Sequence, residues 1–237
     1  MKKNIFWSGI IDGIPIALGY LAVAFSFGIA AVSGGLTPKE ATLISMVNLT
    51  SAGQFAGLGI ITAGGSYFEL ALSQLVINIR YSLMGISLSQ KLDKSFKSLH
   101  TLFLGYALTD EIYAVAVSRT KPIRPMYFLG LATLPYIGWA SGTLLGAVFG
   151  ELLPDMLSQA LAVAIYGMFI AIIVPEAKKC YKTAIIMAVA IAISAIIYYI
   201  PVFDRISGGF SVIICAVTAS LIGAVIFPVK EDDGNGA

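Results

Sequence analysis

Three charged residues lie deep inside apolar stretches of this sequence. Arg80 stands in the middle of residues 70–90, and Asp110 and Glu111 interrupt residues 98–118. A charge inside a bilayer is costly, so such side chains are expected to bind a partner or a substrate. The guanidinium of Arg80 suits a carboxylate, and burial favours the protonated form of a carboxyl group. The predicted chemistry is carboxylate binding and proton transfer. The alternative is a structural ion pair between Arg80 and one of the acids.

The two acids are neighbours in the sequence, and neighbours on a helix point about 100° apart. One of them can therefore pair with Arg80 while the other exchanges protons. In a second interpretation, Thr109 caps a half-helix that begins at the acids. Asp110 and Glu111 then simply stabilise the positive end of that half-helix.

Uncharged polar residues form a second group of candidates. Residues 48–59 place Asn48, Gly53, Gln54 and Phe55 in a glycine-rich patch within an apolar run. Such a patch indicates a protein contact, a cavity, or unwound backbone whose amides and carbonyls bind a ligand. The alternative is close helix packing through the GxxxG spacing that begins at Gly53.

The stretch 70–90 carries its own polar stripe. Gln74, Asn78 and Ser82 follow one another at intervals of four residues, so they share one face of a helix. Arg80 lies off this stripe. Asn78 is therefore a further candidate for contact with a substrate.

The composition shows what must position these residues. Of 237 residues, 58% are hydrophobic and only 12% are charged, and the mean hydropathy is +0.88. This excludes a soluble enzyme and a disordered chain, and a net charge of +2 excludes a nucleic-acid binder. Two cysteines and one histidine cannot form a disulfide framework or a multi-histidine metal centre, and no cofactor is expected. The sequence predicts an integral membrane protein.

The spacing of the charges predicts an all-α, polytopic membrane helix bundle of about seven or eight segments. Six uncharged runs are long enough to cross a bilayer, which takes about 20 residues: 13–38, 41–68, 125–150, 156–175, 183–203 and 206–229. The interrupted stretches 70–90 and 98–118 complete the set. The whole chain, 1–237, forms one membrane domain, and matching Gly and Pro positions suggest two internal repeats, 9–118 and 126–227.

Basic residues in short loops indicate the orientation of the helices. Five clusters hold 12 of the 15 basic residues, at 2–3, 91–97, 119–124, 178–182 and 230. With a cytoplasmic N-terminus and eight full crossings, four of the five clusters lie in the cytoplasm, but the cluster at 91–97 lies on the opposite side of the membrane. The misfit disappears if segments 41–65 and 98–118 each enter and leave on one side, as re-entrant or broken helices. Both topologies remain open.

The polar patches resemble those of the AzlC family of branched-chain amino acid permeases. The similar motifs are Ser51-Ala52-Gly53-Gln54-Phe55, Asn78-Ile79-Arg80-Tyr81 and Thr109-Asp110-Glu111. The resemblance implies a transporter that exports leucine, isoleucine, valine and, in some members, methionine across the bacterial cytoplasmic membrane. We expect secondary transport coupled to the proton-motive force. The resemblance also implies a small membrane partner subunit of the AzlD type.

An aliphatic amino acid needs hydrogen-bond donors, hydrogen-bond acceptors and an apolar pocket, and these needs give the candidates their expected roles. Those expected to bind the amino acid are Asn48, Gly53, Gln54, Phe55, Asn78, Arg80 and Tyr81, and those expected to couple protons are Asp110 and Glu111. The family usually has a histidine at the position of Tyr81. Because this chain has tyrosine there, a histidine cannot carry the proton at that position. Three rival functions are an ion or small-solute channel lined by Asn48, Gln54 and Asn78, a structural subunit, and a membrane-embedded enzyme that uses the two acids. The absence of a GxxxxGK[ST] motif excludes ATP hydrolysis by this chain.

Overall fold

The computed structural model describes residues 5–150, 180–203 and 206–227, together with residues 170, 174, 177 and 178. These residues form helices and no strand, which confirms the all-α class. Four helices are long and apolar enough to cross a membrane: α1 (Ile5–Ser33), α7 (Pro125–Phe149), α9 (Tyr181–Tyr199) and α10 (Gly208–Ile226). The predicted segment 156–175 lies outside the described residues except for residues 170 and 174. The two repeats stay a prediction.

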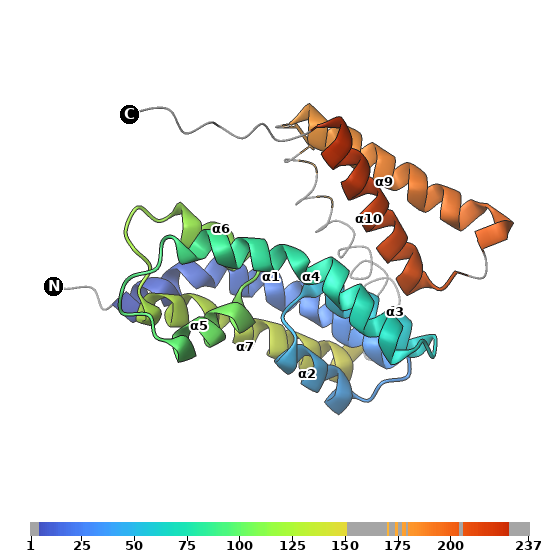
Figure 1. Cartoon of the computed structure of the whole chain (residues 1–237). Helices are drawn as coiled ribbons and strands as arrows, with labels where there is room; N and C mark the ends of the chain where they lie inside the picture. The colour runs from blue at the N-terminus through green and yellow to red at the C-terminus, as the bar shows by residue number, and fades with distance from the viewer. Residues whose placement is uncertain are drawn as a thin grey trace.

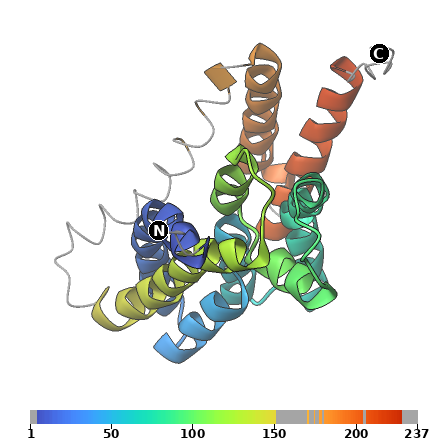
Figure 2. The ribbon, with the colours of Figure 1, turned by 90° about the vertical axis from the view of Figure 1, so that its left-hand side faces the viewer.

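Helices α1 and α7 form the central pair and run side by side in the same direction (Figures 1 and 2). Gly138, Gly142 and Gly146 of α7 face the carbonyl oxygens of Ala17, Leu21 and Phe25 of α1, respectively. The contact therefore advances by four residues on both helices at each step. Glycine at this spacing lets two backbones approach closely, as is common in membranes.

The stretch 41–68, expected to form one helix, forms two half-helices instead. Helix α2 (Pro38–Val47) begins at Thr37, whose side chain accepts a hydrogen bond from Glu40 N. The backbone is extended at Asn48 and Thr50, and α3 (Ser51–Thr62) then turns back. Thr62, at its far end, lies beside Gly34, just past the end of α1. The hairpin α2–α3 therefore enters and leaves at the same end of the bundle.

A second hairpin enters from the other end. Helix α4 (Tyr67–Ser89) leads away from the end of α3, and at about 1.5 Å per residue its 23 residues are long enough to cross a bilayer. Helices α5 (Ser98–Ala107) and α6 (Asp110–Ser118) follow. The loops before α5 and after α6 are joined by Asp93 N to Ile123 O and Ile123 N to Lys91 O, both 2.8 Å. Both ends of the hairpin α5–α6 thus lie where α7 begins.

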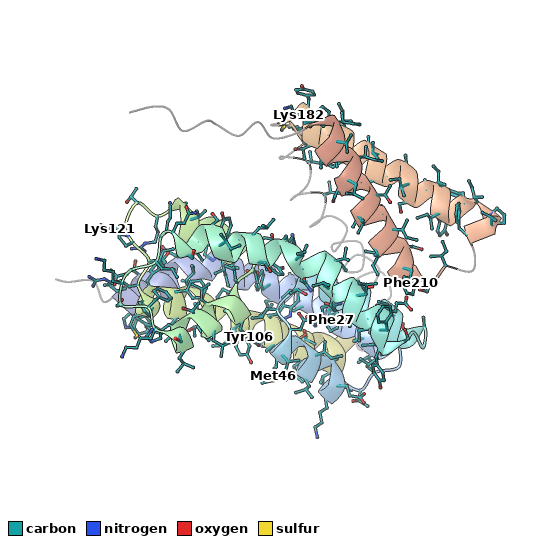
Figure 3. The ribbon with its side chains drawn as sticks, in the orientation of Figure 1. Phe27, Met46, Tyr106, Lys121, Lys182 and Phe210 are labelled. Atoms are coloured by element: carbon teal, nitrogen blue, oxygen red, sulfur yellow. The ribbon has the colours of Figure 1, made fainter. Side chains whose placement is uncertain are left out.

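This architecture decides between the two predicted topologies. The prediction of eight full crossings is wrong, because segments 41–65 and 98–118 are each broken in the middle and return. The basic clusters at 91–97 and 119–124 lie together at the end of the bundle where α1 begins, and Figure 3 shows Lys121 there. The re-entrant alternative is confirmed for this part of the chain, and the misfit of the cluster at 91–97 disappears. The cytoplasmic location of the N-terminus stays a prediction.

The helices α9 and α10 form an outer pair that is attached through α10. A 3-10 turn, Pro201–Phe203, follows α9. Glu69, at the start of α4, is 5% exposed and accepts a hydrogen bond from Ser207, the cap of α10. Ser73 donates to Gly209 O at 3.5 Å. The beginning of α10 therefore docks on the end of the bundle where α4 begins.

Candidate functional site

The broken ends of the two hairpins meet in the middle of the bundle. Tyr106, in the last turn of α5, donates a hydrogen bond to Met46 O in α2, and Figure 3 shows the two side by side. Leu49 and Leu108, which lie in the two breaks, belong to one buried cluster with Tyr20 and Trp139. Tyr20 lies fifteen residues from the first residue of α1 and thirteen from its last. The breaks are therefore at mid-membrane depth.

This arrangement brings two helix N-termini to the centre of the fold, those of α3 and α6. The first backbone N–H groups of a helix lack partners within it and carry a partial positive charge. Thr109 caps α6 and accepts a hydrogen bond from Ile112 N at 3.4 Å, as one sequence interpretation proposed. Thr50, the cap of α3, makes no such side-chain bond. Discontinuous helices whose N-termini face a substrate are a recurring feature of secondary transporters.

Arg80 forms an ion pair with Asp110. Arg80 Nη1 lies 2.8 Å from Asp110 Oδ2 and 3.0 Å from Oδ1. The other terminal nitrogen, Nη2, donates to the Tyr81 hydroxyl at 3.3 Å, and the guanidinium lies 5.0 Å from the centroid of the Tyr81 ring. The guanidinium meets this carboxylate through one nitrogen. The structure therefore shows the ion pair that sequence reasoning had left as an alternative to substrate binding.

Glu111 points the other way. The Tyr20 hydroxyl of α1 donates to Glu111 Oε2 at 2.6 Å and lies 2.6 Å from Thr109 Oγ1. The two neighbouring acids thus serve different contacts, Asp110 toward α4 and Glu111 toward α1, as their angular separation predicts. Sequence reasoning missed Tyr20, because it lies 91 residues from Glu111 in an apolar helix.

Gln54 belongs to a buried network that fixes the hairpin α2–α3 to α7. Its Nε2 donates to Ser45, and its Oε1 accepts from Trp139 Nε1 at 3.0 Å. Ser45 Oγ lies 2.6 Å from Thr143 Oγ1. Gln54 is 2% exposed, and the other three are buried as completely. Both ends of the amide are used inside the protein, which gives Gln54 an anchoring role in this structure. Sequence analysis did not identify Ser45, Trp139 or Thr143.

Asn48 and Phe55 support the shape of the same hairpin. Asn48 Oδ1 accepts from Thr50 N at 3.1 Å and so satisfies a backbone donor within the break. Phe55 packs edge to face against Phe27 of α1, with 5.2 Å between ring centroids. Their predicted contacts with substrate stay predictions.

Gly53 is held against α4 by the polar stripe that the sequence revealed. Gln74 Nε2 donates to Gly53 O at 2.8 Å, and Asn78 Nδ2 donates to Gln74 Oε1 at 3.1 Å. A Cβ at Gly53 would lie 2.4 Å from Thr50 Oγ1 and 2.7 Å from Gln74 Oε1. Glycine therefore permits the contact of α3 with α4, and the packing interpretation of its GxxxG spacing holds beside any role in binding.

The ion pair predicts unequal effects of single and double substitutions. We expect Arg80→Ala or Asp110→Ala alone to lower stability by about 1–3 kcal/mol, because each leaves a charge without its partner; the side chains are 42% and 31% exposed, so the loss is smaller than for a fully buried pair. The double variant should recover much of that loss. Arg80→Lys should keep most of the wild-type stability, since only one nitrogen of Arg80 contacts Asp110. Thermal unfolding of the four variants in detergent measures this, and equal losses in the single and double variants would show that the pair is not coupled.

These features define a polytopic α-helical membrane protein with two re-entrant hairpins. The chain belongs to the AzlC protein family, because the sequence profile of that family matches residues 15–153. Membership is consistent with a role in transport across a membrane. Confirmation of the family rests on the region that contains both hairpins and all the candidate residues.

Relatives of the chain are membrane proteins by name. It is 26% identical to the inner membrane protein YgaZ of Escherichia coli K12 over 227 residues, 92% of this chain and 91% of that protein. It is 29% identical to an uncharacterized membrane protein of Archaeoglobus fulgidus over 195 residues, 81% of this chain and 85% of that protein. No solved structure gives a significant match.

Proposed function

We propose that this protein is a secondary transporter that exports leucine, isoleucine, valine and methionine across the cytoplasmic membrane, driven by the proton gradient. The observation that carries the proposal is the meeting of two half-helix hairpins from opposite ends of the bundle. A site at their junction can be opened to either side by moving one hairpin at a time. In the proposed orientation the N-terminus is cytoplasmic, so the clusters at 91–97 and 119–124 are on the cytoplasmic side.

The junction offers what an aliphatic amino acid needs. The substrate carboxylate is bound by the N-terminal amides of α3, to which the side chain of the cap residue Thr50 makes no hydrogen bond. Phe55 and the aliphatic residues around it, such as Leu58, provide an apolar surface for the side chain. Because Arg80 is paired with Asp110, we place the main carboxylate contact on the backbone.

The two acids suggest how a proton is coupled to this movement. Asp110 is paired with Arg80, whereas the ionisable group that Glu111 contacts by hydrogen bond is the Tyr20 hydroxyl. Glu111 is therefore the proposed proton carrier. Its contact with Tyr20 joins the hairpin α5–α6 to α1, so a change in its charge alters how that hairpin is held.

A small membrane subunit of the AzlD type completes the proposed transporter, as the family resemblance implies. Reconstitution of the chain with and without such a subunit tests this part. Transport by the chain alone would show that the subunit is not required, and it would also exclude a purely structural role for this chain.

The test of the function is flux of labelled amino acids in proteoliposomes. Leucine, isoleucine, valine and methionine should each show saturable counterflow, and a pH gradient should drive net transport. Flux that does not saturate, with measurable single-channel currents, would favour the rival channel. No flux of any of these amino acids, with or without the small subunit, would contradict the proposal.

A further inference from the structure

We propose that Thr50 and Asn78 together bind the ammonium group of the substrate. The inference rests on the proposed function and names the part of the molecule that distinguishes an amino acid from another carboxylate. It also adds Thr50, which sequence analysis did not assign, to the site.

Thr50 Oγ1 and Asn78 Oδ1 are buried oxygen atoms without a hydrogen-bond partner among the described residues of the chain. In that part of the chain they are the two side-chain atoms with this property. A buried acceptor without a donor is destabilising, and native structures place a partner there far more often than not. Two such oxygens at one place indicate a donor that comes from outside the chain.

The hydrogen bonds around Asn78 fix which end of its amide faces the site. Gly53 O can only accept, so Gln74 must present Nε2 to it and Oε1 to Asn78. Gln74 Oε1 can in turn only accept, so Asn78 must present Nδ2 to it. The Asn78 carbonyl oxygen is therefore left as an acceptor, and rotation of the amide would break the chain of bonds.

The side chains of the two residues come close together beside Gly53. A Cβ built on Gly53 would be 2.4 Å from Thr50 Oγ1 and 3.0 Å from Asn78 Nδ2, so both polar side chains approach the same point. Thr50 comes from the break in the hairpin α2–α3, and Asn78 comes from the middle of α4. A group held by both would therefore join the hairpin α2–α3 to α4.

An ammonium group fits this pair better than an anion does. It has N–H bonds enough for both oxygens, whereas a carboxylate would be repelled by the Asn78 carbonyl. The pair also lies beside the N-terminus of α3, where the proposed function places the carboxylate. The two charged groups of an α-amino acid are separated by a single carbon atom, so they can occupy adjacent sites of this kind.

The test compares leucine with 4-methylpentanoate, which has the same carboxylate and side chain but no ammonium group. Each competes with labelled leucine in counterflow by the full chain in proteoliposomes. Wild type should prefer leucine, so the inhibition constant of 4-methylpentanoate divided by that of leucine should be large. Thr50→Val and Asn78→Leu should each reduce this ratio by about 10- to 100-fold. The ratio does not depend on the fraction of protein that is correctly folded. Thr42→Val is the matched control, because the Thr42 hydroxyl donates to Pro38 O of its own helix.

The outcomes separate this inference from the function on which it rests. A ratio that stays at the wild-type value in both variants would overturn the inference while leucine transport stands. Equal loss of affinity for both compounds, together with loss of a sodium dependence that wild-type transport shows, would assign the oxygens to a metal cation and also overturn it. Absence of leucine counterflow in wild type would overturn the proposed function as well.

Discussion

Replacing Glu111 with glutamine is expected to abolish net transport driven by a pH gradient while leaving leucine exchange intact. Glutamine can keep the hydrogen bond with Tyr20, which is 2.6 Å long with the glutamate, but it cannot bind or release a proton. Exchange returns the loaded carrier without a change in protonation, so it does not need the acid. We expect gradient-driven flux to fall by about 100-fold or more and exchange to change little. Both are measured in the same proteoliposomes.

Two companion variants sharpen this result. Tyr20→Phe removes the contact but keeps the acid, so it should slow net transport without abolishing it. Glu40→Gln alters an exposed acid at the start of α2 and should leave coupling unchanged. Gradient-driven transport at the wild-type rate in the Glu111→Gln protein would show that the proton is carried elsewhere.

Replacing Gly146 with alanine is expected to cause the largest loss of stability among conservative substitutions at the central pair. The added Cβ would lie 1.9 Å from Phe25 O and 2.7 Å from Phe25 C, both backbone atoms that cannot rotate away. The helices α1 and α7 must then separate, which removes contacts along their whole length. We expect a loss of at least about 3 kcal/mol and little folded protein after extraction in detergent.

The matched control is the same change on the other helix of the pair. Among the residues that the structure describes, a Cβ on Gly19 of α1 would meet no heavy atom within 4 Å beyond its chain neighbours and the nearby backbone of its own helix, so the effect of Gly19→Ala should come from helix propensity alone. Alanine is favoured over glycine in a helix by about 1 kcal/mol, so this variant should be as stable as wild type or more so. Similar melting temperatures for the two variants would contradict the close approach of α1 and α7.

The sequence predicted the class of the fold and some contacts of the candidate residues, and the reasons can be given residue by residue. Scarce charge and long apolar runs predicted the membrane helices. The 100° between adjacent helical positions predicted that Asp110 and Glu111 would make different contacts. The misplaced basic cluster at 91–97 was the signal for re-entrant segments, because full crossings alone could not accommodate it.

The partners of these residues could not be predicted in the same way. Tyr20, Trp139 and Thr143 lie 85 to 98 residues from the side chains they contact, within helices whose sequence is otherwise apolar. Their contacts depend on how helices pack across the bundle, and one sequence does not contain that information. For Gln54 the same limit applied, since its polarity suggested a ligand while the packing of α2, α3 and α7 gives it two buried partners, Ser45 and Trp139.

The central claim is that two hairpins enter from opposite sides of the membrane and meet in the middle. It is tested most directly by labelling single cysteines with an impermeant thiol reagent, in intact and in permeabilised cells, after Cys180 and Cys215 are replaced by serine. The test positions flank the two hairpins in exposed places: Lys39→Cys, Tyr67→Cys, Ser95→Cys and Thr120→Cys. The structure predicts that positions 39 and 67 are labelled from one side, and positions 95 and 120 from the other. Labelling of positions 39 and 67 from opposite sides would show that residues 41–65 cross the membrane, and would contradict the account.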